Sequence, residues 1–163
     1  LVPPVLDTPH LLYFGIPLVA LLLVNAWHAK HKTERALVND MCAILIFSLG
    51  GAAAYVLGDG GWDRTMAAVV LLSFLYFTGS AFFVKSVFRE RTNRRWTTYA
   101  RAYHLVLLIV PWTIGFPLLT LPFVYSAVRA FIYGGTSMRP MKAGIIEIVG
   151  SIQFLALSAF LIE

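Results

Sequence analysis

Long apolar segments alternate with short polar, glycine-containing or proline-containing connections along the whole chain of 163 residues. Most of these segments approach the roughly 20 apolar residues that an α-helix needs to cross a lipid bilayer. Glycine and proline inside such segments are tolerated, because neighbouring helices satisfy the backbone groups that they free. We therefore predict an all-α bundle of six transmembrane helices, at about residues 11–28, 38–57, 65–87, 99–111, 118–133 and 143–162.

The composition places these helices in lipid. Hydrophobic residues make up 59% of the chain, and the mean hydropathy is +0.77. Charged residues make up 13%, about half of the share that a soluble domain carries. Because a soluble fold of this size could not bury so much apolar surface, we predict an integral membrane protein with a single transmembrane domain over residues 1–163.

The distribution of basic residues predicts the orientation in the membrane. Every Lys and Arg except Arg64 falls at or near the connections after the first, third and fifth segments. Basic loops stay on the cytoplasmic side, so these connections are predicted to face the cytoplasm of a bacterial inner (plasma) membrane. Both visible chain ends then face outward, which suggests that further helices of a larger bundle precede Leu1. We read the net charge of +5 as a topology signal, and expect no nucleic-acid partner.

The third apolar segment ends in a cationic stretch, FFVKSVFRERTNRRW (82–96), in which only Glu90 is acidic. Its basic residues are Lys85, Arg89, Arg91, Arg94 and Arg95. Guanidinium groups bind phosphate through paired, charge-assisted hydrogen bonds, so these residues are candidates for holding an anionic lipid headgroup. The alternative is that Lys85 and Arg89 extend to the membrane surface and that the other three arginines only anchor the helix end.

Four polar residues lie inside or at the edge of apolar segments, near the same predicted side of the membrane: Asn39, Asp40, His104 and Glu147. Ionisable groups at mid-depth cost roughly 2.5–3.5 kcal/mol and are candidates for function. Small residues at helical spacing beside them favour close helix packing, so we predict that the four converge on one cytoplasm-facing pocket. The alternatives are a helix-start charge for Asp40, an ion-pair partner for Glu147 and an interior hydrogen bond for His104.

No cofactor or metal site is expected. His28 and His104 lie at similar predicted depth on different helices and could in principle ligate haem. A multi-haem membrane cytochrome needs ligand pairs in both halves of the membrane, which His10 and His31 do not supply. The single Cys42 excludes an internal disulfide bond.

Three blocks of the chain resemble the YwiC-like family of bacterial membrane proteins. The blocks are FFVKSVFRERTNRRWTTYARAYH (82–104), TERALVNDMCAILIFSL (33–49) and RPMKAGIIEI (139–148). The layout of this family is similar to that of UbiA-type prenyltransferases, so the resemblance implies a UbiA-like helix arrangement. Those enzymes bind Mg²⁺ and a prenyl diphosphate through two Asp-rich motifs. This chain has KSVFRER (85–91) where the second motif is expected, which suits a bare anion better than Mg²⁺.

We therefore expect a non-catalytic accessory or structural subunit of a membrane complex, with a pocket for an anionic amphiphile such as a lipid, an isoprenoid or a quinone. Membrane lipids and other subunits are the expected partners. The alternative is a prenyltransferase-like enzyme, in which Lys85, Arg89 and Arg91 hold a diphosphate and Asp40, His104 or Glu147 acts as acid or base. A small-anion transporter ranks last, because the outer halves of the predicted helices carry no charge.

Overall fold

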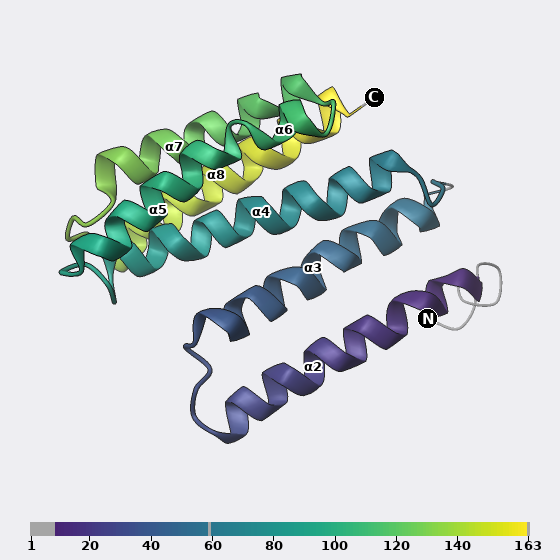
Figure 1. Ribbon diagram of the computed structural model, residues 1–163, viewed down its shortest axis with the longest axis horizontal. Coiled ribbons are helices and arrows are strands. Elements are labelled where there is room, and N and C mark those ends of the chain that lie inside the picture. Colours follow the sequence, from purple (N-terminus) through teal and green to yellow (C-terminus); the bar gives the residue numbers. More distant parts are fainter. Residues whose placement is uncertain (1–8, 59, 163) are drawn as a thin grey trace. The chain divides into compact units, whose positions relative to one another are not determined.

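The computed structural model describes residues 9–58 and 60–162, and over these residues the chain is helical without any strand (Figure 1). The all-α prediction is therefore confirmed. The elements are η1 (Pro9–Phe14), α2 (Gly15–Lys30), α3 (Leu37–Leu57), α4 (Arg64–Val87), α5 (Arg94–Leu107), α6 (Val110–Thr113), η2 (Pro117–Thr120), α7 (Leu121–Tyr133) and α8 (Pro140–Leu161).

Among residues 9–58 and 60–162, four helical stretches are long and apolar enough to cross a membrane: η1 with α2, then α3, α4 and α8. They contain 21 to 24 residues each. At 1.5 Å per residue each is about 30 Å long or more, which matches the hydrocarbon thickness of a bilayer. The predicted membrane-spanning character is therefore supported by length and composition at these four stretches.

The structure places the helix predicted at 99–111 further upstream in the chain, and the helix predicted at 118–133 is shorter than expected. The first begins at Arg94, where the Asn93 side chain accepts a hydrogen bond from the Trp96 backbone N–H at 3.3 Å. It ends at Leu107, because Pro111 cannot continue a helix through its own position and instead opens the short α6. Pro117 likewise opens η2. With 14 and 13 residues, α5 and α7 are only about 20 Å long.

The chain divides within α4 into two compact units, and each is described by itself. Unit 1 ends at Phe74 and contains η1, α2, α3 and the first part of α4. Its core is formed by Phe14, Ala52 and Val56, and the Phe14 ring stacks on Trp62 at 5.1 Å. The prediction of one domain over the whole chain stays a prediction.

The start of α4 is fixed by a capping carboxylate. Asp63 accepts a hydrogen bond from the Met66 backbone N–H at 2.9 Å and another from the Tyr55 hydroxyl at 3.0 Å. The bond from the Met66 backbone favours the charged form and is the main reason why the pKa of Asp63 is lowered. A carboxylate is also favoured at the positive end of the helix dipole.

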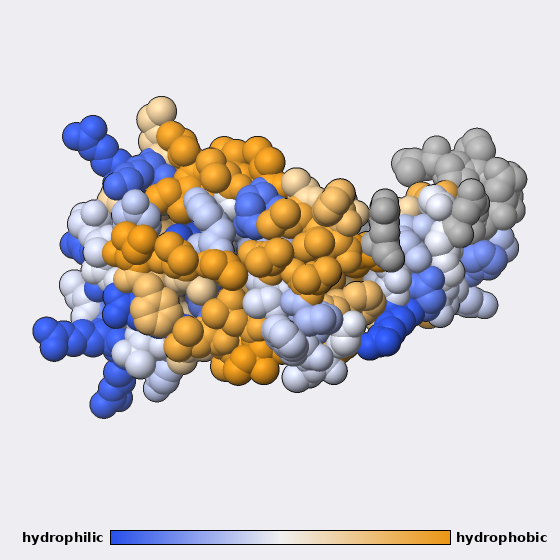
Figure 2. Space-filling view, turned by 90° about the horizontal axis from the view of Figure 1, so that it is seen from above, coloured by the Kyte–Doolittle hydropathy of each residue, from blue (hydrophilic) through white to orange (hydrophobic). Residues whose placement is uncertain are grey.

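Unit 2 begins at Leu75 and packs the second part of α4 together with α5, α7 and α8, which lie alongside one another in Figure 1. An aromatic layer fastens α5 to α4. Phe82 stacks on Trp96 at 5.2 Å and on Tyr103 at 5.0 Å, and the Trp96 indole N–H donates to the Phe82 carbonyl at 3.2 Å. On the face drawn in Figure 2, hydrophobic residues cover much of the surface.

Helix α8 approaches α4 at a glycine. Tyr76 of α4 stacks on Phe154 of α8 with ring centroids 4.1 Å apart. A Cβ atom at Gly150 would lie 2.7 Å from the Tyr76 hydroxyl and 2.7 Å from a ring carbon of Tyr125. The close contact of these helices therefore requires the missing side chain at position 150.

We expect the substitution Gly150→Ala to lower the free energy of unfolding by about 1–3 kcal/mol, because both tyrosine rings must shift to admit the methyl group. The matched control is Gly144→Ala on the same helix, where an added Cβ meets no atom within 4 Å. That change should be neutral or stabilising by up to about 1 kcal/mol through helix propensity. Thermal unfolding of the detergent-solubilised proteins measures both, and equal stabilities would contradict the described packing.

Candidate functional site

An open groove of about 540 Å³ lies beside the first turns of α5. We call it the cationic groove, and it is lined by Arg91, Thr92, Arg94, Thr97, Thr98, Arg101 and Gly135. Its lining offers three guanidinium groups and three hydroxyl groups. Within the part of the chain that the structure describes, no carboxylate lines it.

Two of the three guanidinium groups are held by the segment that connects α7 to α8. Arg91 donates to the Ser137 hydroxyl at 2.9 Å. Arg101 donates to the carbonyl oxygens of Phe131 at 3.2 Å and Gly134 at 3.3 Å, at the end of α7. These contacts reduce the freedom of two long side chains, so their positions in the groove are largely set before any ligand binds.

One wall of the groove depends on a glycine with a left-handed backbone. Gly135 has a φ of 81°, and a Cβ atom there would lie 3.0 Å from the Thr97 hydroxyl oxygen. Any other residue would strain the backbone and crowd α5. The α7–α8 connection can therefore close against the first turn of α5 only because residue 135 has no side chain.

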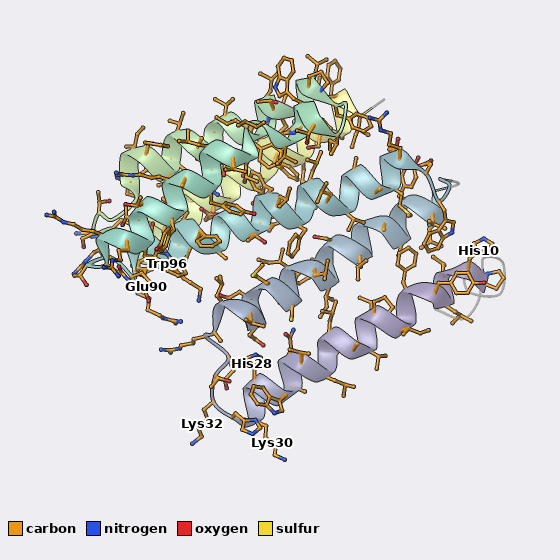
Figure 3. All side chains as sticks on the ribbon, viewed as in Figure 1. His10, His28, Lys30, Lys32, Glu90 and Trp96 are labelled. Carbon is orange, nitrogen blue, oxygen red and sulfur yellow. The ribbon has the colours of Figure 1, made fainter. Side chains whose placement is uncertain are left out.

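Asn93, whose side chain caps α5, also forms a hydrogen bond with Glu90, the acidic residue nearest to it in the sequence. The Asn93 side chain donates to the Glu90 carboxylate at 3.0 Å, while its oxygen caps the helix. Figure 3 shows Glu90 and Trp96 at the same end of unit 2. Arg94 is the first residue of α5, so it lies at the positive end of the helix dipole.

The structure separates the five predicted headgroup residues. Arg91 and Arg94 line the cationic groove, and the structure adds Arg101, which the sequence analysis had counted only as a topology charge. Arg95 is exposed on the same turn as Arg94 without lining the groove, and neither Lys85 nor Arg89 lines it. Anion binding by any of these residues stays a prediction.

A second polar group, the Arg129 cluster, lies inside unit 2 and consists of Arg129, Glu147, Ser80 and Ser126. Arg129 is only 2% exposed. Its guanidinium donates to the Glu147 carboxylate, to Ser80 at 2.8 Å and to Ser126 at 3.3 Å. The cluster joins α4, α7 and α8. Removing a charge from water costs several kcal/mol, so this arrangement depends on the ion pair and its hydrogen bonds.

Aromatic rings complete the surroundings of this buried guanidinium. Its central carbon lies 5.0 Å from the Phe83 ring centroid and 5.8 Å from that of Tyr76. Cation–π attraction is strongest where water is excluded, and the Arg129 side chain is almost fully buried. The apolar rings of α4 therefore stabilise the same charge that Glu147 neutralises.

His104 contacts α4 beside this cluster. It is fully buried, and its Nδ1 lies 2.7 Å from the Ala100 carbonyl, so we assign the proton to Nδ1. Its Nε2 would lie 3.1 Å from a Cβ atom at Gly79, the neighbour of Ser80. His104 therefore packs against α4 at the residue that precedes Ser80 of the Arg129 cluster.

The other two predicted pocket residues lie in unit 1. The Asn39 side chain donates to the Glu34 carbonyl at 2.8 Å, and Asp40 lies in the first turn of α3, where a negative charge is favoured by the helix dipole. Their convergence with His104 and Glu147 on one pocket stays a prediction. Neither His104 nor Glu147 lines the cationic groove.

Sequence reasoning missed the role of Arg129, which it assigned to a cytoplasmic connection. The sequence did contain a signal for the interior position of Arg129. Arg129 lies four residues inside the end of α7, and Ser126 precedes it by one helical turn on the same face. A basic residue at that depth with a hydroxyl at the i−3 position indicates an inward-facing side chain.

Among residues 9–58 and 60–162, no three His, Cys, Asp or Glu side chains gather as metal ligands. Figure 3 places His10 and His28 at opposite ends of the helical stretch η1–α2, and His28 Nδ1 lies 2.8 Å from the Thr33 hydroxyl. The expectation that neither haem nor Mg²⁺ binds stays a prediction.

The fold and these polar groups define a class: an all-helical protein with four helices able to cross a membrane and with arginines both in its core and in a surface groove. The family model described as "YwiC-like protein" matches residues 1–55. A relative from Bacillus subtilis (strain 168), "Uncharacterized protein YwiC", is 38% identical over 158 residues, which are 97% of this chain and 66% of the relative. The chain belongs to the YwiC-like family, as the three sequence blocks predicted.

A second relative is an "Uncharacterized protein" of Haemophilus influenzae (strain ATCC 51907 / DSM 11121 / KW20 / Rd), 32% identical over 146 residues. These residues are 90% of this chain and 61% of that relative. The chain thus spans just under two thirds of the length of the first relative and somewhat less of the second. No solved structure matches the chain, so the UbiA-like arrangement stays a prediction.

We expect Glu147→Gln to destabilise the protein by about 3–5 kcal/mol, because it leaves the Arg129 charge buried without a counter-charge. Replacing both partners, as in Arg129→Met with Glu147→Leu, should recover a large part of that loss, since no charge then remains in the core. Unfolding of the single variants Arg129→Met and Glu147→Leu and of their double variant gives the coupling energy. Additive losses would mean that the pair is not coupled in the folded protein.

Proposed function

We propose that this protein is a non-catalytic component of a membrane assembly and that its cationic groove binds the anionic headgroup of a membrane amphiphile. The observation that carries this proposal is the meeting of Arg91, Arg94 and Arg101 in one groove of about 540 Å³. A cavity of this size can admit a headgroup as well as a bare ion. The predicted cytoplasmic orientation of this end is part of the proposal.

Guanidinium groups are suited to this task. They donate two parallel hydrogen bonds to a phosphate, and charge-assisted bonds of this kind are roughly twice as strong as neutral ones. Basic residues near an anionic membrane surface each contribute about 1 kcal/mol to attraction. Because Arg91 and Arg101 already contact the α7–α8 connection, binding immobilises fewer side-chain torsions than it would with freely moving arginines.

The amphiphilic nature of the ligand is supported by the surroundings of the groove. The groove lies at one end of helices whose outward side chains are largely apolar, such as Leu105, which is 50% exposed, and Ile132, which is 59% exposed. Lipid or a partner helix must cover such side chains. A ligand with a charged head and an apolar tail therefore satisfies both kinds of surface at once.

Membership in an assembly is the second part of the proposal. Helices α5 and α7 are shorter than the bilayer core, and oligomerisation is one way in which a membrane protein accommodates helices of this length. An affinity-tagged full-length protein solubilised from its native membrane in mild detergent should carry a partner subunit in a fixed ratio. A preparation that contains only the monomer under these conditions would contradict this part.

We expect the double variant Arg91→Gln with Arg94→Gln to bind phosphatidylglycerol about tenfold or more weakly than the wild type, because the groove loses two of its three guanidinium groups that donate charge-assisted hydrogen bonds to the phosphate. Native mass spectrometry of the full chain, titrated with the lipid in mild detergent, measures this. Arg95→Gln is the matched control and should change affinity less than twofold, since Arg95 does not line the groove. Equal losses in both variants would point to general charge attraction and against the groove.

A titration of the same protein with farnesyl diphosphate tests the prenyltransferase alternative. Binding without turnover agrees with the proposal. Release of diphosphate by the wild type, abolished in the Arg91 and Arg94 double variant, would replace it with an enzymatic function.

A further inference from the structure

We infer that the cationic groove selects a phosphate group with two or more negative charges, as in a phosphomonoester or diphosphate headgroup, over the single charge of a phosphodiester. This inference rests on the proposed function and specifies the ligand class. It concerns one groove, whose guanidinium groups belong to Arg91, Arg94 and Arg101.

The first argument is the charge that the groove leaves for a ligand to neutralise. The hydrogen-bond acceptors that hold Arg91 and Arg101 are neutral oxygen atoms, from the Ser137 hydroxyl and from the backbone of Phe131 and Gly134. The carboxylate of Glu90 accepts a hydrogen bond from Asn93. A phosphodiester with one negative charge would leave most of the positive charge of the groove uncompensated.

The Arg129 cluster shows how this protein balances the charge of an arginine with one of its own carboxylates. In the Arg129 cluster, the guanidinium forms an ion pair with Glu147 inside the protein. In the cationic groove, the described lining supplies hydroxyls from threonines in place of a carboxylate. The contrast indicates that the counter-charge of the groove comes from a ligand.

The second argument is the number of oxygen atoms that the groove can engage. A terminal phosphate presents three unsubstituted oxygens, whereas a phosphodiester presents two. Three guanidinium groups, the Thr97 hydroxyl and the positive end of α5 converge on one space. A terminal phosphate can therefore accept from more of these donors at the same time than a diester can.

The phosphate group that the groove would bind can belong to a soluble ion or to a lipid. The exposed face of α5 favours the lipid. Beyond Thr98, the exposed apolar residues Ala102 and Leu105 follow at helical spacing on α5, and the exposed Ile109 lies two residues past the end of this helix. This stripe begins at the groove and runs along the helix. It offers an apolar chain a continuous surface next to the headgroup, which an inorganic ion would not use.

The test compares headgroups with identical dioctanoyl chains on the full-length protein in mild detergent at pH 8: phosphatidic acid, phosphatidylglycerol and phosphatidylcholine. Inorganic phosphate and pyrophosphate are the tail-free probes. Isothermal titration should give an affinity for phosphatidic acid at least tenfold above that for phosphatidylglycerol, with phosphatidylcholine weakest. Inorganic phosphate should bind at least tenfold more weakly than phosphatidic acid.

A pH series adds a readout that belongs to the ligand. The second ionisation of a phosphomonoester has a pKa of about 6, whereas a phosphodiester does not titrate in this range and arginine stays charged. Lowering the pH from 8 to 5 should therefore weaken phosphatidic acid binding several-fold and bring it toward that of phosphatidylglycerol. Phosphatidylglycerol binding should change little.

Two variants separate the inference from the proposal on which it rests. Arg94→Lys keeps the charge but loses the fork of paired donors, so it should reduce the preference for phosphatidic acid more than it reduces phosphatidylglycerol binding. Arg95→Gln should leave both unchanged.

Equal, arginine-dependent binding of phosphatidic acid and phosphatidylglycerol would overturn the selectivity and leave the headgroup site standing. Lipid binding that is independent of Arg91 and Arg94 would overturn the proposed function as well. Inorganic phosphate that binds as tightly as phosphatidic acid would overturn the lipid source.

Discussion

The burial of one charge organises the second unit. Arg129 lies in an apolar core, where an unpaired guanidinium could not remain, and Glu147, Ser80 and Ser126 supply its counter-charge and hydrogen bonds. Because these partners come from α4, α7 and α8, a single side chain fixes three helices to one another. The end of α7 and the connection from α7 to α8 follow Arg129 directly in the chain, so the buried pair also fixes where they lie. These are the segments that hold Arg101 and Arg91, so the geometry of the surface groove depends on the buried pair.

The two arginine sites illustrate how environment assigns different roles to the same residue type. In the core, a carboxylate from the chain completes the charge balance, and aromatic rings exclude water. In the groove, neutral oxygens orient the guanidinium groups without cancelling their charge. The first arrangement stabilises the packing of three helices, and the second leaves positive charge that, in the proposed function, an anionic ligand neutralises. Such preorganisation lowers the entropic cost of binding, which makes surface arginines useful in spite of strong competition from water.

The sequence predicted the helical class, the family and six transmembrane helices, of which the described residues contain four that are long and apolar enough to cross a membrane. The middle of the chain was predicted less well. The segment at 99–111 carries Arg101 and His104 among its apolar residues, and Pro111 and Pro117 lie in the short elements α6 and η2 between α5 and α7. The cap at Asn93 moves the start of α5 five residues upstream of the predicted start at Tyr99. Hydropathy averages over such local signals. Of the predicted headgroup residues, Arg91 and Arg94 line the groove, but Arg101 and the core position of Arg129 were not recognised.

By itself, the sequence determined what local chemistry determines: the four long apolar helices, the breaks at proline and glycine, and the clustering of basic residues at particular connections. Only the tertiary structure decided which arginine is neutralised, which lines a groove and which faces away. Arg94 and Arg95 are adjacent and chemically identical, yet successive residues on a helix point about 100° apart, so one lines the groove and the other does not. Arg129 meets partners 18 and 49 residues away in the chain. Contacts across such separations exist only once helix packing brings the elements together, and no local pattern encodes them.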